Sequence, residues 1–207
     1  MITYFIKHYD LLLTAFLEHL WIVFITLLIS LVIAAVLSYV LLNSEKLTNV
    51  FVQIFGAIYS IPSLALFAML IPLCGLGNGT AIIVLCVYNQ YLLLRNIMTG
   101  MQNVDKSYLE AGTGMGMSRL QLVTKVQVPL AMPSIVAGIR LAIISTTGIA
   151  TIAATINAGG LGTILLSGLR TMNVYKIIWG MILSVIIALT ADLILKWVED
   201  KTGRKSR

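Results

Sequence analysis

Two charged side chains, Arg140 and Asp192, stand inside long apolar stretches of this sequence. Ionisable groups at membrane depth are costly unless they are paired, and they often mark the path of a solute or ion. Arg140 lies roughly 10 Å beyond Pro133 along a helix, and Asp192 comes shortly before the basic end of the chain. We expect these two side chains to form an ion pair between two membrane helices. A direct role in substrate binding or gating is the alternative.

No other group of residues has a spacing that suggests chemistry of its own. The sequence contains no G-x-x-x-x-G-K-[ST] phosphate-binding loop, so we expect no ATP hydrolysis by this chain. His8 and His19 lack metal-ligand spacing, and Cys74 and Cys86 are expected to be small side chains in apolar surroundings. We therefore predict no catalytic residue, no metal ligand and no cofactor. A membrane-embedded enzyme would require polar catalytic groups at one depth, and the sequence shows no such cluster.

The composition is that of an all-α integral membrane protein. The chain is 59% hydrophobic and only 11% charged, whereas soluble domains are about 25% charged. Its charge-poor stretches are long enough to cross a bilayer as helices. The expected spans are residues 20–43, 50–71, 80–100, 133–156 and 175–197, and Pro62 is expected to kink the second of them. Residues 1–18 form an external or interfacial segment before the transmembrane domain of residues 19–198, and residues 199–207 form a basic cytoplasmic tail.

The distribution of basic residues predicts the orientation of these five spans. Lysine and arginine concentrate on the cytoplasmic side of membrane proteins. With the polar segment Val104–Pro133 inside, the basic residues on the inner face are Lys46, Arg95, Lys106, Arg119, Lys125, Lys196, Lys201, Arg204, Lys205 and Arg207. Those on the outer face are Lys7, Arg170 and Lys176. We therefore expect the N-terminus outside and the C-terminus inside, and we interpret the net charge of +6 as an orientation signal, not as a nucleic-acid site.

The segment Val104–Pro133 predicts two short helices joined by a glycine turn. Capping-box patterns begin at Ser107, with Glu110, and at Ser118, with Gln121. Three alternating glycines lie between them: Gly112, Gly114 and Gly116. Glycine accepts backbone angles that other residues avoid, so a sharp turn is expected there. Each of Pro129 and Pro133 suits the first turn of a new helix better than its interior.

This segment resembles the cytoplasmic loop of permease subunits in ATP-driven (ABC) importers, written E-A-A-x3-G-x9-I-x-L-P. The matching positions are Glu110, Ala111, Gly112, Gly116, Val126, Val128 and Pro129. Gly112 replaces an alanine, and the two valines replace isoleucine and leucine. The resemblance implies that the loop docks into a cleft on a separate ATPase subunit and transmits its closure. The alternative is an amphipathic helix lying on the lipid surface.

The same resemblance implies the partners and the location of the chain. It implies a multi-pass protein of the bacterial inner membrane, surrounded by lipid, which pairs with an identical or related permease. A separate binding protein delivers the solute, and nucleic acid is not a partner. The alternative from another class is a secondary transporter or channel that works alone. Such proteins often carry inverted repeats, and no internal repeat is visible here.

Shorter runs are similar to one subgroup, the permeases for glycine betaine, carnitine and choline. They are Ile61–Ala65, Leu94–Gly100, Ala137–Arg140 and the Gly-Gly-Leu-Gly run at 159–162. The resemblance implies import of small quaternary-ammonium or zwitterionic osmoprotectants; a different small amine or amino-acid-like solute is the alternative. The glycine loop, comprising Asn157, Gly159, Gly160 and Gly162, is expected outside. It either contacts the binding protein and packs helices at a gate, or is a plain turn.

Three aromatic residues, Tyr88, Tyr91 and Trp179, have types that suit a quaternary amine. Aromatic ring faces attract such cations. Tyrosine and tryptophan near the ends of spans are more often anchors at the membrane interface. We expect these three to be anchors.

Overall fold

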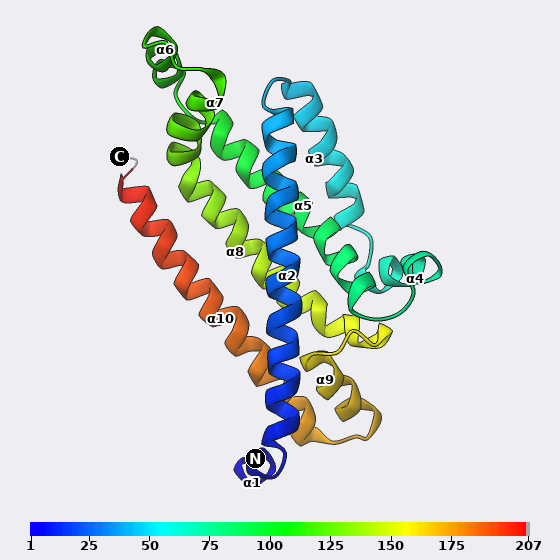
Figure 1. Ribbon diagram of the computed structural model, residues 1–207. Helices are drawn as coiled ribbons and strands as arrows, with labels where there is room; N and C mark the ends of the chain where they lie inside the picture. Colours follow the sequence, from blue (N-terminus) through cyan, green and yellow to red (C-terminus); the bar gives the residue numbers. More distant parts are fainter. Residues whose placement is uncertain (206–207) are drawn as a thin grey trace.

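The computed structural model describes residues 1–205, and all regular structure in that range is helical (Figure 1). The elements are α1 (Ile2–Lys7), α2 (Tyr9–Leu41), α3 (Glu45–Tyr59), α4 (Ser63–Cys74), α5 (Asn78–Gln102), α6 (Lys106–Gly114), α7 (Arg119–Leu122), the π-helical turn η1 (Val123–Gln127), α8 (Val128–Ile152), the 3-10 turn η2 (Ala153–Ile156), α9 (Leu161–Arg170) and α10 (Val174–Lys205). Within residues 1–205, four helical stretches are long and apolar enough to cross a membrane: α2, α5, α7 through η2, and α10. The expected all-helical class is confirmed.

Helix α5 lies at the centre of the bundle and packs against α2, α3, α4 and α8. A buried polar network joins three of these helices. The Asn89 amide of α5 donates to Ser30 Oγ of α2 at 3.3 Å, and Thr146 of α8 donates to Asn89 Oδ1 at 3.0 Å. Side-chain hydrogen bonds across helices help membrane bundles to associate, because lipid tails are as apolar as leucine. This network fixes α5 between α2 and α8.

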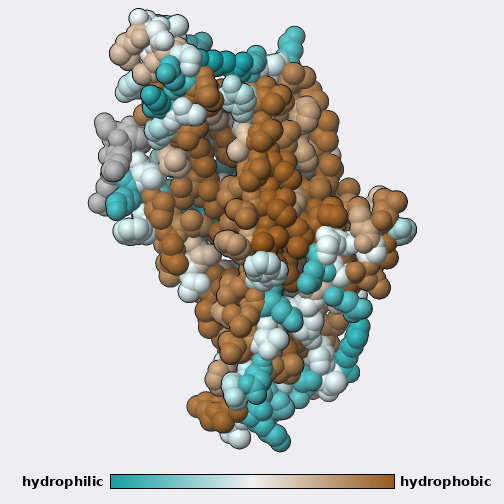
Figure 2. All heavy atoms as spheres, in the orientation of Figure 1, coloured by the Kyte–Doolittle hydropathy of each residue, from teal (hydrophilic) through white to brown (hydrophobic). Residues whose placement is uncertain are grey.

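Helix α2 runs without a break through residue 20, where a boundary between the N-terminal segment and the first span was expected. No glycine or proline interrupts Tyr9–Leu41, and its 33 residues correspond to about 50 Å. Its outer face carries exposed large apolar side chains: Trp21, Phe24, Leu28, Val32, Val36 and Val40. Figure 2 shows the hydrophobic surface over the middle of the molecule and hydrophilic atoms at both ends. That surface is suited to lipid contact.

The stretch expected as one span with a kink at Pro62 is instead two helices, α3 and α4, bent by 95°. Pro62 has no N–H and a fixed φ, so it precedes α4 as its N-cap residue and does not continue α3. The break leaves carbonyl groups without helical partners. Ser60 Oγ donates to the Ala57 carbonyl at 2.7 Å, and Tyr88 Oη donates to the Ile61 carbonyl at 2.6 Å. These bonds stabilise the bend.

The prediction that Pro133 begins a helix is wrong. One continuous helical stretch runs from Arg119 to Ile156, and Pro133 lies inside α8. The π-helical turn η1 directly precedes the other proline of this stretch, Pro129: the Val128 N–H bonds to the carbonyl of Val123, five residues earlier. The wider turn relieves the clash that a proline ring at Pro129 makes in a regular helix. The short second loop helix is therefore continuous with α8.

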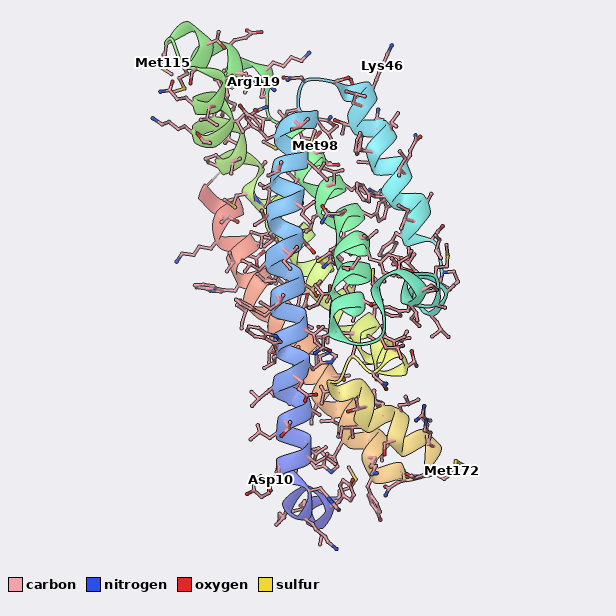
Figure 3. The ribbon with its side chains drawn as sticks, turned by 45° about the vertical axis from the view of Figure 1, so that its right-hand side comes forward. Asp10, Lys46, Met98, Met115, Arg119 and Met172 are labelled. Carbon is pink, nitrogen blue, oxygen red and sulfur yellow. The ribbon has the colours of Figure 1, made fainter. Side chains whose placement is uncertain are left out.

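The two ends of the bundle carry different features. Lys46, Met115 and Arg119 lie at one end, and Asp10 and Met172 lie at the other (Figure 3). The segment containing α6 and α7 thus projects from the end opposite to α9. The C-terminal end of α10 lies near the α6–α7 end (Figure 1).

Candidate functional site

The α6–α7 loop, residues 105–129, consists of two capped helices. Helix α6 begins after Asp105, whose carboxylate accepts the Ser107 backbone N–H at 2.9 Å. This hydrogen bond lowers the pKa of the Asp105 carboxyl. The capping box expected at Ser107 and Glu110 is therefore wrong, because the upstream carboxylate is available as the cap. The expected box at Ser118 and Gln121 is confirmed, with the Ser118 N–H donating to Gln121 Oε1 at 2.8 Å.

A glycine turn joins the two helices, as expected. Gly116 has φ +78°, in the left-handed region that favours glycine. The Met117 N–H closes the end of α6 by bonding to the Gly112 carbonyl at 3.1 Å. Gly112 is buried, and a Cβ there would lie 2.5 Å from Leu122 Cδ2. Gly112 therefore lets α6 approach α7 more closely than an alanine would.

The α6–α7 loop exposes side chains at one end of the molecule, beyond the hydrophobic surface of its middle part (Figure 2). Glu110, Ala111, Gly116 and Pro129 are exposed, and Val126 and Val128 are half-buried. Three large apolar side chains in this loop are also exposed: Tyr108, Met115 and Leu120. Apolar groups presented outside that surface by a rigid turn are typical of a protein contact. The loop thus carries exposed apolar side chains at a polar end of the molecule.

Arg140 joins α8 to α10 through two carboxylates. Its Nε lies 3.2 Å from Asp192 Oδ1, as an ionic contact without an aligned hydrogen bond, and its Nη1 donates to Glu199 Oε2 at 3.0 Å. Glu199 was not expected in this cluster, because residues 199–207 were expected to form the cytoplasmic tail. Helix α10 in fact continues past Glu199. Glu199 follows Asp192 by two helical turns, so this spacing predicts that both carboxylates lie on one face of the helix.

The glycine loop is fixed by α2. Gly159 and Gly160 have φ +77° and +71°, and Asn157 has φ +62°. Glu18 Oε2 accepts the Gly160 N–H at 2.9 Å. The adjacent buried His19 packs against Gly160, and its Nε2 lies 3.2 Å from the Thr147 carbonyl oxygen. Nothing in the spacing of Glu18 and His19 along the sequence indicates this contact.

Gly162 lies in the first turn of α9, where it makes a close approach to η2 and the end of α8. A Cβ at this position would collide with the Thr151 carbonyl group. Tyr88, Tyr91 and Trp179, which were weighed as a box for a quaternary amine and expected to be anchors, do not all come together in the structure. Trp179 packs against Phe5, with ring centroids 4.7 Å apart, while Tyr88 and Tyr91 both pack against Tyr59.

Long apolar helices with polar ends define a multi-pass membrane protein, here with an exposed loop between α5 and α8 and an arginine–carboxylate cluster. Residues 30–205 match the family described as binding-protein-dependent transport system inner membrane component. The chain belongs to that family, which confirms the expected resemblance to importer permeases.

Known transport permeases can be aligned with most of this chain, as two examples show. The carnitine transport permease protein OpuCD of Listeria monocytogenes is 38% identical over 169 residues, covering 81% of this chain and 76% of that protein. The glycine betaine/carnitine/choline transport system permease protein OpuCB of Bacillus subtilis is 36% identical over 188 residues, covering 91% and 87%. The expected resemblance to that subgroup is confirmed.

The fold is shared with a solved transporter structure. An inward-facing conformation of the MetNI methionine ABC transporter matches with a TM-score of 0.82 and 24% identity, covering 97% of this chain and 98% of that one. At this identity the likeness supports the fold alone.

Proposed function

We propose that this chain is the permease subunit of an ATP-driven importer for small quaternary-ammonium osmoprotectants such as glycine betaine, carnitine or choline. The observation that carries the proposal is the similarity, across most of both chains, to permeases named for these three solutes. The chain pairs with an identical or related permease, and the pathway lies between the two. A separate ATPase supplies energy, and a binding protein supplies solute.

In the bacterial inner membrane, we place five spans with the N-terminus outside and the C-terminus inside. The second span is the broken pair α3–α4, and the others are α2, α5, α8 with η2, and α10. From Leu20 to Leu41, α2 is about 33 Å long, which matches the roughly 30 Å hydrocarbon core. The preceding turns of α2, with Glu18 and the glycine loop, then lie at the outer face. The excess of basic residues near Lys46 and Arg119 supports this orientation.

Coupling follows from the continuity of α7, η1 and α8. When ATP closes the ATPase pair, movement of the docked α6–α7 loop passes into α8 as a rigid lever, because no break separates them. Arg140 links α8 to α10 through Asp192 and Glu199, so the two helices move together. Such motion between inward-open and outward-open packings is alternating access.

Reconstitution of the chain with its ATPase and binding protein tests the proposal. We expect ATP hydrolysis to rise when glycine betaine, carnitine or choline is added, and a Gly116→Trp chain to lose that rise. Hydrolysis indifferent to all three solutes would refute the substrate class. Uptake by the permease chain without an ATPase would favour the stand-alone carrier.

The Arg140 cluster has its own test. Arg140→Gln leaves two carboxylates facing each other at a partly buried site, so we expect a loss of about 1–3 kcal/mol in stability. The matched control is the triple variant Arg140→Gln, Asp192→Asn and Glu199→Gln, which keeps the shape and removes all charge. We expect the triple variant to be more stable than Arg140→Gln alone, as measured by thermal unfolding in detergent. Equal stability of the two variants would show that the cluster does not pin α8 to α10.

A further inference from the structure

A polar pocket lies between α5 and α8. Its volume is about 350 Å³, within the range of small-molecule sites. The lining residues are Tyr91, Leu92, Arg95, Asn96, Thr99, Ser134 and Leu141. The polar members supply a guanidinium, an amide and hydroxyl groups, and no carboxylate lines the pocket. Its donors suit an anionic oxygen ligand.

Arg95 is a cation without an acidic partner in the part of the chain that the structure describes, where both ion pairs involve Arg140. Arg95 Nη1 donates to Tyr91 Oη at 2.8 Å, and its guanidinium lies 5.8 Å from the centroid of the Tyr91 ring. Tyr91 is in turn held by Tyr59, at 5.2 Å between ring centroids. The guanidinium is therefore positioned by a packed tyrosine while its charge stays available.

The pocket faces away from α2. On α5, Asn89, Gln90 and Leu93 are buried on the α2 side, and Arg95 projects from the opposite side of the helix at the period of 3.6 residues. The expected orientation counts Arg95 on the inner face, but α5 continues past it to Gln102, so the exposed Arg95 lies about 10 Å before the end of the helix. An arginine at that depth is costly against lipid, and such residues face a bundle interior or a water-filled cavity.

The neighbouring face of α8 is largely polar or small. Ser134, Gly138, Ser145 and Gly148 follow one another at helical spacing, with Leu141 as the large apolar side chain among them. Ser145 Oγ lies 3.2 Å from Tyr59 Oη, so this stripe is continuous with the tyrosines that position Arg95. The outer face of α2, by contrast, exposes mainly large apolar side chains, such as Val32, Val36 and Val40. The α5–α8 face is thus suited to line an aqueous path and not to contact lipid.

We propose that the Arg95 pocket binds the carboxylate of a zwitterionic solute as it passes through the permease. Arg95 provides a fork of N–H donors that matches a carboxylate, the Thr99 and Ser134 hydroxyls supply further donors, and Tyr91 is a positioning residue. This inference rests on the proposed function and deepens it. Glycine betaine and carnitine carry a carboxylate, and choline carries the same trimethylammonium group without one. A lipid phosphate has the same anionic chemistry, and the test separates these sources.

The first test compares two solutes in one transporter. The chain is reconstituted with its ATPase and binding protein in neutral phosphatidylcholine vesicles, as wild type and Arg95→Gln. We expect Arg95→Gln to raise the half-saturating concentration for glycine betaine about tenfold or more, from loss of a charge-assisted hydrogen bond, and to change that for choline less than about twofold. Arg170→Gln, at the other end of the molecule, is the matched control. Equal changes for both solutes would overturn the proposal.

A second readout needs no transport. Saturation-transfer NMR on the permease–ATPase complex in nanodiscs, without binding protein, monitors the methyl protons of glycine betaine and choline. We expect signal for glycine betaine that Arg95→Gln abolishes and Tyr91→Phe weakens. Equal signals in wild type and Arg95→Gln would overturn the pocket. The proposal would also be overturned if Arg95→Gln reduced the signals of both solutes, and only when phosphatidylglycerol is added. That result would assign Arg95 to a lipid phosphate.

The two hypotheses fail differently. If neither solute stimulates ATP hydrolysis in the wild type, the proposed function fails. The NMR comparison then still decides whether the pocket binds a carboxylate. If transport succeeds but glycine betaine and choline respond alike to Arg95→Gln, the importer stands and the pocket assignment falls.

Discussion

The two ends of the molecule hold their turns in different ways. The α6–α7 loop is closed by contacts between near neighbours, such as Gly112 with Met117 and Ser118 with Gln121. The glycine loop is held by residues distant in the chain, and the bond between Glu18 and Gly160 spans 142 positions. The α6–α7 loop is thus stabilised by contacts within its own segment and has an exposed surface. The glycine loop is stabilised by contacts with the helix bundle.

This contrast predicts where a mutation acts. A change in the α6–α7 loop alters docking before it alters stability, because few bundle contacts depend on that loop. A change in the glycine loop alters stability first, because α2, α8 and α9 meet there. Variants at each end, with matched controls, test this separation.

Gly162→Val has the largest expected effect. Its Cβ would collide with the backbone of Thr151, which cannot rotate away, so we expect a loss of about 3 kcal/mol or more. Thermal unfolding of the purified chain in detergent measures this. Gly79→Val is the control: Gly79 is also the second residue of a helix before a threonine, and a Cβ there meets nothing within 4 Å. Equal unfolding temperatures for the two variants would contradict the close approach.

Gly116→Ala should act at the other end and mainly on coupling. Alanine at φ +78° costs about 1–2 kcal/mol of local strain, which shifts the angle between α6 and α7. We expect solute-stimulated ATP hydrolysis to fall several-fold while the unfolding temperature of the bundle changes little. Gly114→Ala, in the same loop without positive φ or a near neighbour, should retain coupling. A loss of coupling in both variants would indicate that loop flexibility, and not the turn geometry, is required.

The same contrast explains what the sequence could predict. The glycine turn and the Ser118–Gln121 box follow from residues within one short segment, so their types and spacing suffice. The contacts of Glu18 and His19 with the glycine loop depend on how α2 packs, which no local pattern encodes. Pro133 was misleading because a proline disfavours a helix interior, yet α8 continues through it. The π turn at Val123–Gln127 lies next to Pro129 and relieves the clash of that proline. Glu199 could have been predicted from the sequence, since it lies two helical turns after Asp192 and therefore on the same face of the helix.

Glu18→Gln tests the long-range bond with a smaller effect. The amide keeps the shape and weakens a charge-assisted hydrogen bond to the Gly160 N–H, so we expect a loss of about 1 kcal/mol. The unfolding temperature should fall while loop coupling per folded molecule stays unchanged. Asp10→Asn, an exposed carboxylate on the same helix, should show no shift. A fall in coupling without a fall in stability would show that Glu18 acts in transport and does not stabilise the glycine loop.

Gly112→Ala has the smallest expected effect and sharpens the comparison most. It restores the alanine of the loop pattern that this chain resembles. The new Cβ would lie 2.5 Å from Leu122 Cδ2, but that atom ends a flexible side chain and can turn away. We therefore expect a cost below about 1 kcal/mol and coupled ATP hydrolysis close to wild type. Gly112→Val adds two branches that Leu122 cannot clear, so coupling should fall with it. Equal loss in both variants would show that α6 and α7 tolerate no added atom, and that the glycine is required for docking geometry in this chain.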